Sequence, residues 1–348
     1  MRNPNPTQTI LFAACFSLLS AFTSCKSDKP EIIDQAPIVA GSKSVYITNE
    51  GNFQFGNASV SYYNPEQNQI VEDVFKANNN QNLGDVCQSI AYLNEKFYLV
   101  VNNSHKIEVV NSGTFKSCGT ISGLNSPRYF LPVNNQKGYV TDLYDNQISI
   151  VDLNSNSVTG HIPCTGWTEE LMMISGKVFV TNPYRDKLYV INTLTDQISD
   201  SISIGYASNS LKEDKFGKLW VLCAGNSTIS GGLYCINPAT NVVEQSLPFS
   251  STSNPCRLRM NATNDTLYWL NNGIYRMSIT ATVTPTAPFI AQSGVNYYGL
   301  GIDPSTNEIY VSDAIDYVQK GMIYRYQSNG TLIHTFRAGI SPGDFYFK

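Results

Sequence analysis

A short apolar strand with a central aromatic residue returns seven times along the chain, and this repeat limits the fold more than any other feature. The seven aromatic residues are Tyr46, Tyr98, Tyr139, Phe179, Trp220, Tyr268 and Tyr310. Their successive spacings are 52, 41, 40, 41, 48 and 42 residues. A period near 40 to 45 residues is typical of propeller blades with four strands each. We therefore predict an all-β protein, a seven-bladed β-propeller with four-stranded blades.

A second strand with alternating apolar and polar residues follows most copies of the first, as in 147–152 and 187–192. An inner strand precedes most copies, but the N-terminal segment leads directly into the first one. The chain instead ends in an extra strand, Pro342 to Phe347. We predict that this C-terminal strand completes the first blade and closes the ring, which removes two exposed strand edges. A pair of β-sandwiches is the alternative, but it explains neither the period nor the extra strand.

The first residues have the pattern of an export signal. Arg2 precedes an apolar run from Ile10 to Phe22 that is too short to span a bilayer, and Cys25 follows it. This arrangement resembles a bacterial lipoprotein signal, which implies a lipidated Cys25. An ordinary secretory signal with an incidental cysteine is the alternative. We predict a signal peptide over 1–24, the lipidated cysteine with a flexible tether over 25–41, and the propeller over 42–348.

Charged residues make up 14% of the chain, against about 25% in typical domains. The formal net charge is -4 and there is no long basic run, so we expect no nucleic-acid partner. Six cysteines follow Cys25, and none forms a C-x-x-C pair. Cys223 and Cys235 flank one predicted hairpin and are the best candidates for a disulfide; buried free thiols are the alternative.

Ligands of propellers usually bind on the face formed by the loops between second and third strands and by the loops between blades. In this chain those loops are rich in aromatic and amide side chains. Such side chains suit a large, flat ligand edged with amide groups, although turn formation and packing between blades also account for them. The candidate ligand-binding residues are Phe53, Phe55, Asn103, Arg128, Tyr144, Trp167, Tyr184, Arg185, Tyr206, Arg257, Tyr297, Tyr298 and Tyr317.

Several segments resemble a known family. Tyr46 to Asn49 and Phe179 to Asn182 are similar to the repeat of YVTN-type propellers. The order of five further segments resembles one branch of Bacteroidetes propeller lipoproteins, over nearly all of 43–348; these are 49–52, 83–86, 169–170, 303–304 and 310–314. That branch includes surface lipoproteins that capture cobalamin (vitamin B12) and pass it to a TonB-dependent outer-membrane transporter. The resemblance implies a corrinoid ligand, such a transporter as partner, and a lipid anchor in the outer membrane, on the cell surface or the periplasmic face.

Few residues indicate catalysis. Glu169 and Glu170 are adjacent, and neighbours on a strand point to opposite faces, so they do not easily share an acid–base site. The chain has only three histidines and no G-x-S-x-G motif. A calcium-dependent lactonase would need several carboxylates around one ion. The candidates for such a site are Glu50, Asp85, Glu170, Asp303 and Asp344, and nothing in the sequence brings them together.

Three functions remain open at this point. The leading hypothesis is a monomeric lipoprotein that captures a small molecule, with a corrinoid as first candidate and with no cofactor, no metal and no enzymatic activity. The second is an interaction scaffold that grips an envelope protein or a glycan. The third is a metal-dependent hydrolase of the lactonase type.

Overall fold

The structure, a computed structural model, describes residues 43–249 and 254–348. The predicted signal peptide, the lipidation site Cys25 and the tether lie outside the described residues. No helix within the described ranges has both the length and the apolar character needed to cross a membrane.

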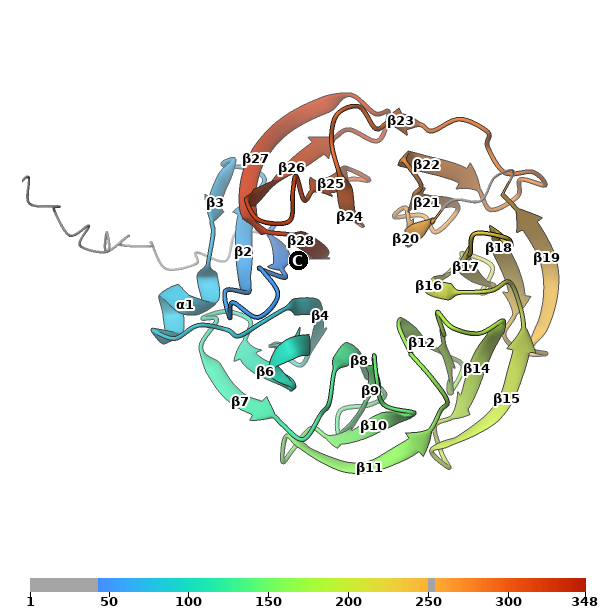
Figure 1. Ribbon diagram of the computed structural model, residues 1–348, viewed down its shortest axis with the longest axis horizontal. Coiled ribbons are helices and arrows are strands. Elements are labelled where there is room, and N and C mark those ends of the chain that lie inside the picture. Colours follow the sequence, from blue (N-terminus) through green and yellow to red (C-terminus); the bar gives the residue numbers. More distant parts are fainter. Residues whose placement is uncertain (1–42, 250–253) are drawn as a thin grey trace, which may run out of the picture. The chain divides into compact units, whose positions relative to one another are not determined.

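Seven four-stranded antiparallel sheets form the blades of a β-propeller, as predicted. Figure 1 shows the inner strands around the centre and the outer strands at the rim. The inner strands are β28 (Pro342–Phe347), β4 (Cys87–Leu93), β8 (Pro127–Pro132), β12 (Leu171–Ile174), β16 (Ser208–Glu213), β20 (Cys256–Met260) and β24 (Tyr297–Ile302). The second strands are β1 (Val45–Asn49), β5 (Lys96–Val101), β9 (Lys137–Asp142), β13 (Lys177–Val180), β17 (Leu219–Gly225), β21 (Thr266–Leu270) and β25 (Ile309–Asp313).

The remaining two strands of each blade lie further out. The third strands are β2 (Ser59–Asn64), β6 (Lys106–Asn111), β10 (Gln147–Asp152), β14 (Lys187–Asn192), β18 (Ser230–Asn237), β22 (Gly273–Ser278) and β26 (Lys320–Tyr326). The outer strands are β3 (Gln69–Val71), β7 (Ser117–Ile121), β11 (Ser157–Pro163), β15 (Gln197–Ser203), β19 (Val242–Pro248), β23 (Ile290–Ala291) and β27 (Leu332–Ile340). In blades 2 to 7, each repeat of the sequence therefore comprises the inner strand of one blade followed by the second, third and outer strands of the same blade.

The C-terminal strand closes the ring as expected. β28 pairs antiparallel with β1, so that Tyr46 lies opposite Tyr346 and Ile47 opposite Phe345. Beyond this ladder, the amide of Ser44 donates to the carbonyl of Lys348 at 2.9 Å. Blade 1 is thus assembled from both ends of the described chain, and the inner edge of β1 is covered.

The aromatic repeat marks the second strands and builds the core between blades. The seven aromatic side chains are all buried, with exposed fractions of 4% or less. Tyr46 packs in a cluster with Phe97 of blade 2, whereas Val45 and Ile47 pack with Tyr310 of blade 7. Side chains alternate between the two faces of a strand, so the aromatic fills the space toward the next blade and its neighbours fill the space toward the previous one. The same division recurs around the ring in seven apolar clusters.

The proposed pairing of Cys223 and Cys235 is wrong. All six cysteines of the described part are free. In the β17–β18 hairpin, Cys235 lies opposite Trp220 and Cys223 lies opposite Gly232. The two thiols therefore project from opposite faces of the blade, and they belong to the apolar clusters on its two sides.

A short helix that the repeat did not predict connects blade 1 to blade 2. Helix α1 (Val74–Asn79) begins after Asp73, whose carboxylate accepts from the amide of Lys76 at 3.0 Å. Val74 and Phe75 are buried in the cluster between these blades. The insertion accounts for the longest spacing of the repeat, 52 residues, because it lies between the first two aromatic residues.

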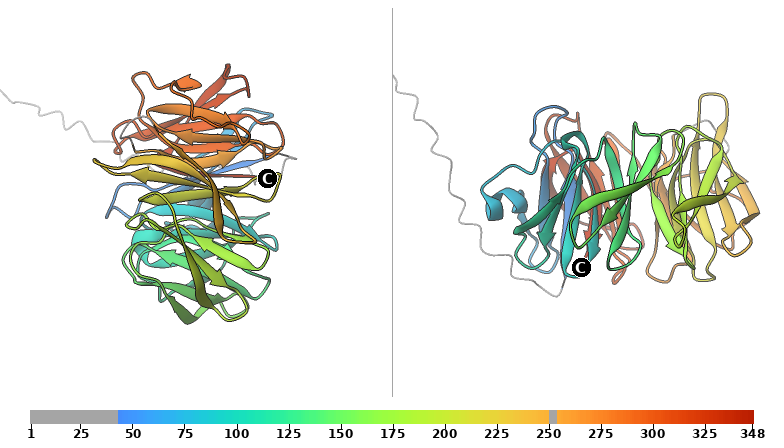
Figure 2. Two further views of the ribbon diagram at one scale, coloured as in Figure 1. Left: turned by 90° about the vertical axis from the view of Figure 1, so that its right-hand side faces the viewer. Right: turned by 90° about the horizontal axis from the view of Figure 1, so that it is seen from below.

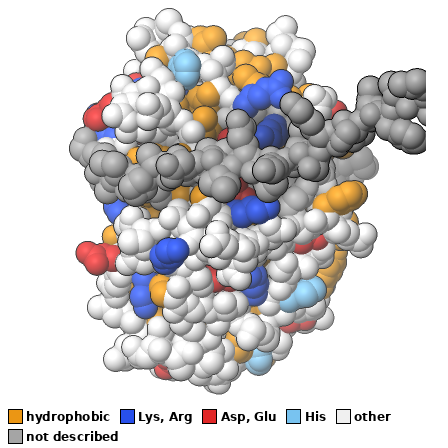
Figure 3. Space-filling model, turned by 90° about the vertical axis from the view of Figure 1, so that its left-hand side faces the viewer, with side chains coloured by type: hydrophobic (Ala, Val, Ile, Leu, Met, Phe, Trp, Pro, Cys, Tyr) orange, Lys and Arg blue, Asp and Glu red, His pale blue; other side chains and the backbone are white. Residues whose placement is uncertain are grey.

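Edge-on views show the strands of the blades running between the two ends of the ring, so that the connecting loops gather at these ends (Figure 2). On the side that carries blade 1, basic and acidic side chains are scattered singly among uncharged ones (Figure 3). Several charged side chains line the channel instead, and those of Arg128, Lys212, Arg257, Arg259 and Asp344 come from inner strands.

Candidate functional site

A wide cavity of about 1050 Å³ opens at the end of the ring where the loops between second and third strands lie. Residues from all seven blades line it. Most of the candidate ligand-binding residues meet there, namely Phe53, Asn103, Arg128, Tyr144, Trp167, Tyr184, Tyr206, Arg257, Tyr297, Tyr298 and Tyr317. Phe55 and Arg185, the other two candidates, are exposed and do not line the cavity.

Exposed aromatic rings surround the mouth of this cavity. Phe53, Tyr144, Tyr184 and Tyr317 line it and still expose 62%, 73%, 59% and 48% of their surface. Rings this exposed contribute little to packing between blades, which was the alternative explanation for them. Their faces remain available for stacking against a flat molecule.

The local sequence explains how the rim tyrosines are held. In several blades an Asn or Asp lies at the end of the second strand or just after it, and its side chain accepts from the backbone amide two residues later. Asp142 accepts from the amide of Tyr144 at 2.8 Å, and Asn182 accepts from that of Tyr184 at 2.9 Å. These are Asx turns. The polar residue that ends the repeat therefore fixes the start of a loop that carries a rim tyrosine.

Trp167 links the rim to the interior of the cavity. Its ring meets Tyr184 edge to face at 5.3 Å between centroids, and the Arg128 guanidinium lies 5.5 Å from its centroid. The indole Nε1 is buried and has no hydrogen-bond partner among the described residues. An unpaired buried donor next to a cavity can bind an acceptor of a ligand.

Polar side chains at β-bulges form the floor of the wide cavity. Six inner strands have a register shift near this end. In β28 the extra residue is Gly343, and in the other five the bulged stretches carry Gln88, Arg128, Asn209, Arg257 and Tyr298. All five side chains line the cavity. A bulge changes the direction in which a side chain points, and here it directs polar groups into the channel.

Several floor residues were not among the candidate ligand-binding residues, although Glu50, Glu169 and Glu170 were considered for catalysis or metal binding. These floor residues are Glu50, Gln88, Tyr129, Glu169, Glu170 and Asn209. A signal for three of them exists in the repeat, because Gln88, Glu169 and Asn209 lie about ten residues before the buried aromatic of their own blade, as Arg128 and Arg257 do. Aligning the blades on the aromatic residue would have placed these side chains in one ring.

Arg128 connects two of its neighbours in this ring. Its guanidinium donates to Gln88 Oε1 at 2.6 Å and, through Nε and Nη2, to Glu169 Oε1 at 2.9 and 2.6 Å. Burial lowers the pKa of Arg128, but Glu169, together with Tyr129 and Glu50, outweighs this effect and the net shift is upward. The Arg128 guanidinium in the floor therefore stays charged.

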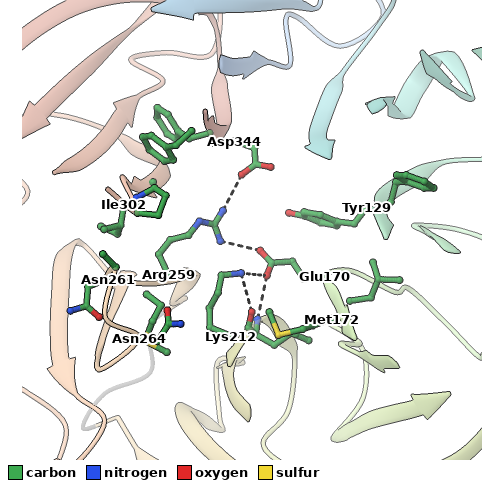
Figure 4. Close-up of a pocket in the computed structure, with 18 residues that line it drawn as sticks. Tyr129, Glu170, Met172, Lys212, Arg259, Asn261, Asn264, Ile302 and Asp344 are labelled. Atoms are coloured by element: carbon green, nitrogen blue, oxygen red, sulfur yellow. Dashed lines mark hydrogen bonds and ion pairs between the residues drawn. The ribbon is translucent and has the colours of Figure 1, made fainter. Parts of the chain in front are cut away.

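A narrow cavity of about 520 Å³ lies at the opposite end of the channel, and Figure 4 shows its residues. Arg259 donates to Glu170 Oε1 and to Asp344 Oδ1, both at 3.1 Å. Lys212 Nζ donates to Glu170 Oε2 at 3.3 Å. We call these four residues the charge network. Tyr129 and Glu170 line both cavities, so the network lies between them.

The pKa shifts within the charge network differ between Glu170 and Lys212. Burial raises the pKa of Glu170, but Lys212, Arg259 and the amide of Leu211 outweigh it, and the net shift is downward. Burial lowers the pKa of Lys212 more than Glu170 raises it. For the Glu170 carboxylate, at the centre of the network, the neighbouring charges thus more than offset the effect of burial, whereas for Lys212 they do not.

The candidate carboxylates for catalysis or metal binding do not converge. The described residues contain no group of three or more His, Cys, Asp or Glu side chains placed to hold a metal ion. Glu169 contacts Arg128, whereas Glu170 contacts Lys212 and Arg259. The two adjacent glutamates thus serve different ion pairs.

Comparison with solved structures shows the same fold in distant proteins. A quinonprotein alcohol dehydrogenase-like protein from Bacteroides thetaiotaomicron is 19% identical, with a TM-score of 0.70 over 86% of this chain and 77% of that one. A putative 6-phosphogluconolactonase from Bacteroides fragilis is 11% identical, with a TM-score of 0.68 over 90% and 100% of the two chains. A protein of the same description from Bacteroides uniformis is 13% identical, with a TM-score of 0.67 over 88% and 99%.

At these identities the likeness shows the fold alone. No curated protein matches the sequence significantly. One family model, described as a domain of unknown function, DUF5074, matches residues 43–347. That match spans all seven blades, and the chain therefore belongs to the DUF5074 family.

Proposed function

We propose that this protein captures a small molecule in the wide cavity. The observation that carries the proposal is the group of four exposed aromatic rings around the mouth of a polar-floored cavity. The volume of about 1050 Å³ matches the upper end of the range for ligand pockets, roughly 300 to 1,000 Å³. The unpaired indole N–H of Trp167 offers an additional donor to the ligand.

A corrinoid such as cobalamin is the first candidate ligand. It is large and flat and is edged with amide groups, so the rim aromatics can stack on it while the polar floor pairs with its edge. The YVTN-like segments and the resemblance to cobalamin-capturing lipoproteins support the same choice. In this proposal Cys25 anchors the protein in the outer membrane, on the cell surface or the periplasmic face, and the ligand passes to a TonB-dependent transporter.

We further propose that the protein binds without catalysing a reaction. Two of the three glutamates that line the wide cavity, Glu169 and Glu170, are engaged in ion pairs with Arg128, Lys212 and Arg259. A carboxylate held in this way is a poor general base, because proton uptake would break the pair.

Calorimetric titration of the purified chain with cyanocobalamin tests the corrinoid proposal. We expect saturable binding at nanomolar strength, about -12 kcal/mol. No heat at micromolar concentrations would exclude the corrinoid. In that case glycans and envelope proteins, the ligands of an interaction scaffold, become the next candidates.

Substitution of the rim tests whether the wide cavity is the site. Tyr144→Ala with Tyr184→Ala removes two exposed rings, and we expect at least tenfold weaker binding with unchanged unfolding, since neither ring is buried. Phe216→Ala is the matched control, because Phe216 exposes 65% of its surface and lines neither cavity. Equal affinities for the double variant and the control would move the site away from this mouth.

A further inference from the structure

Two charged side chains of the wide cavity have no ion pair among the described residues. Arg128, Lys212 and Arg259 each contact a carboxylate. Arg257 and Glu50 also line the channel, but neither forms a salt bridge within the described part of the chain. They form no salt bridge with each other or with another described residue, although the charge of Arg257 lowers the pKa of Glu50 against the larger effect of burial.

Tyr298 holds both groups in place. Its hydroxyl donates to Glu50 Oε1 at 2.7 Å. Its carbonyl accepts from Arg257 Nε at 3.3 Å, and the guanidinium carbon lies 5.6 Å from the centroid of its ring. Arg257 Nη1 donates to the hydroxyl of Tyr129 at 3.3 Å. The Nη2 group of Arg257 makes no hydrogen bond with the described residues.

Gly343 leaves the space between these groups open. A Cβ atom at this position would lie 3.1 Å from Glu50 Oε1 and 3.7 Å from Arg257 Nη2. Both charged groups therefore border the same small volume, and no side chain of residue 343 fills it. A ligand group that enters this volume contacts both of them.

The chemistry of the two side chains defines which group fits. Above its raised pKa Glu50 is ionised and only accepts hydrogen bonds, whereas a guanidinium only donates them. A bridging group must donate toward Glu50 and accept from Arg257, and a primary carboxamide does both. A carboxylate would be repelled by Glu50, and an ammonium group would be repelled by Arg257.

We propose that Glu50 and Arg257 form a clamp that binds a neutral primary carboxamide of the captured molecule. This inference rests on the proposed function, because it places the ligand in the wide cavity. It adds the identity of one group that the ligand carries. It also explains how the site could discriminate between an amide and the corresponding carboxylic acid, because the ionised acid would repel Glu50 and leave it without a donor.

Benzamide and benzoate are suitable probes, because both have a phenyl ring and they differ only in the group that the clamp would bind. We measure their binding to the full chain by ligand-observed NMR titration at millimolar concentrations. For the unchanged protein we expect benzamide to bind at least about tenfold more tightly than benzoate.

Glu50→Gln gives the decisive comparison. The variant removes the repulsion and supplies an amide donor beside Arg257, so we expect the preference to reverse in favour of benzoate. Arg257→Gln is the second variant, and we expect it to lose both probes. Glu213→Gln is the control, because Glu213 is exposed and lines neither cavity.

An unchanged benzamide-to-benzoate ratio in Glu50→Gln would overturn the clamp, and so would the absence of saturable benzamide binding to the unchanged protein. The cyanocobalamin titration reports on the proposed function separately. If cyanocobalamin binds but the ratio does not change, the clamp is wrong and the capture function stands. If benzamide shows the reversal but cyanocobalamin does not bind, the clamp stands and the corrinoid is excluded.

Discussion

The channel has two levels: the charge network forms the lower one, and Glu50 and Arg257 in the wide cavity form the upper one. Their buried charges are arranged differently. In the charge network, Glu170 is held by both Lys212 and Arg259. One level above, Glu50 accepts a hydrogen bond from Tyr298 and has no ion pair with a described residue. The pKa shifts follow this difference. Burial raises the pKa of Glu50 and its surroundings do not offset the rise, whereas the pKa of Glu170 is lowered despite burial.

The difference separates a structural role from a binding role. Leaving a buried charge without a salt bridge costs free energy. We therefore expect charged side chains such as Glu50 and Arg257 to be kept for a role other than folding, such as binding. The charge network satisfies its own members and offers little to a ligand. Glu50 and Arg257 have unused hydrogen-bonding capacity, and a ligand can use it.

Deleting residues 341–348 removes a part of both levels and has the largest expected effect. The deletion takes away β28, and with it Asp344 of the charge network and Gly343 beside the clamp. It also exposes the inner edge of β1. We expect the ring to open and cooperative unfolding to be lost, as judged by circular dichroism during heating. Deletion of Lys348 alone is the control, and a cooperative transition in both chains would contradict the closure.

Glu170→Gln and Glu50→Gln make the same chemical change at the two levels. Breaking a buried ion pair costs about 3 to 5 kcal/mol, and we expect this loss for Glu170→Gln because Lys212 and Arg259 lose their shared partner. For Glu50→Gln we expect no loss at pH 7, since the variant removes a buried charge that lacks an ion pair. Denaturant unfolding of both variants measures the difference. Equal losses would mean that the two levels do not differ.

The two glutamates should also respond to acid in opposite directions. The folded-state pKa of Glu170 lies below its ordinary value of 4.5, so the unfolded chain takes up the proton first. The stability that Glu170 contributes is present above pH 4.5 and is lost as the pH falls through the lowered pKa. Glu50 has a raised folded-state pKa, so its contribution to stability is full below pH 4.5 and is lost as the pH rises through that raised pKa.

Denaturant unfolding at pH 7 and pH 4 measures this contrast. We expect the advantage of the unchanged chain over Glu170→Gln to shrink toward pH 4, because the lowered pKa of Glu170 makes the unfolded chain take up the proton first. Relative to Glu50→Gln, the unchanged chain should gain stability toward pH 4. Changes in the same direction for both variants would contradict the assignment of paired and unpaired charges.

The sequence predicts the ring far better than the charge arrangement. Each buried aromatic such as Trp220 or Tyr310 needs a partner on the next blade, so a local pattern repeated seven times is enough to specify the architecture. Most rim aromatics were also identified, because their loops follow the repeated strands. Helix α1 was missed, since it interrupts the period instead of following it.

The ion pairs and hydrogen bonds of the floor could not be predicted because they depend on contacts between neighbouring blades. Gln88, Arg128 and Glu169 are about 40 residues apart in sequence yet hydrogen-bonded in space. Which strand carries a bulge, and which carboxylate pairs with which cation, follows from packing and not from local propensity. Gly343 gave no signal at all, because its role is to leave a volume empty.

Gly343→Ala gives the smallest expected effect and tests how loosely Glu50 is held. The backbone at Gly343 does not require glycine, but the new Cβ would lie 3.1 Å from Glu50 Oε1, which is closer than ordinary contact. Among the described residues only Tyr298 forms a hydrogen bond with that carboxylate, so it can shift by a few tenths of an ångström. We expect a change below about 1 kcal/mol in the free energy of unfolding, and weaker benzamide binding because the clamp is partly filled.

Gly339→Ala is the matched control. A Cβ there would lie 2.5 Å from Cγ of Asn49, a buried amide held by Ser59 and Ser61 at 3.1 and 2.9 Å. Asn49 cannot move without breaking those bonds, so we expect a loss of roughly 1 to 3 kcal/mol, as in other overpacked sites. If Gly343→Ala destabilises the protein as much as Gly339→Ala, then Glu50 is as rigidly held as a core residue. In that case the upper level of the channel is built like the lower one, and its free charges are part of the scaffold instead of a site.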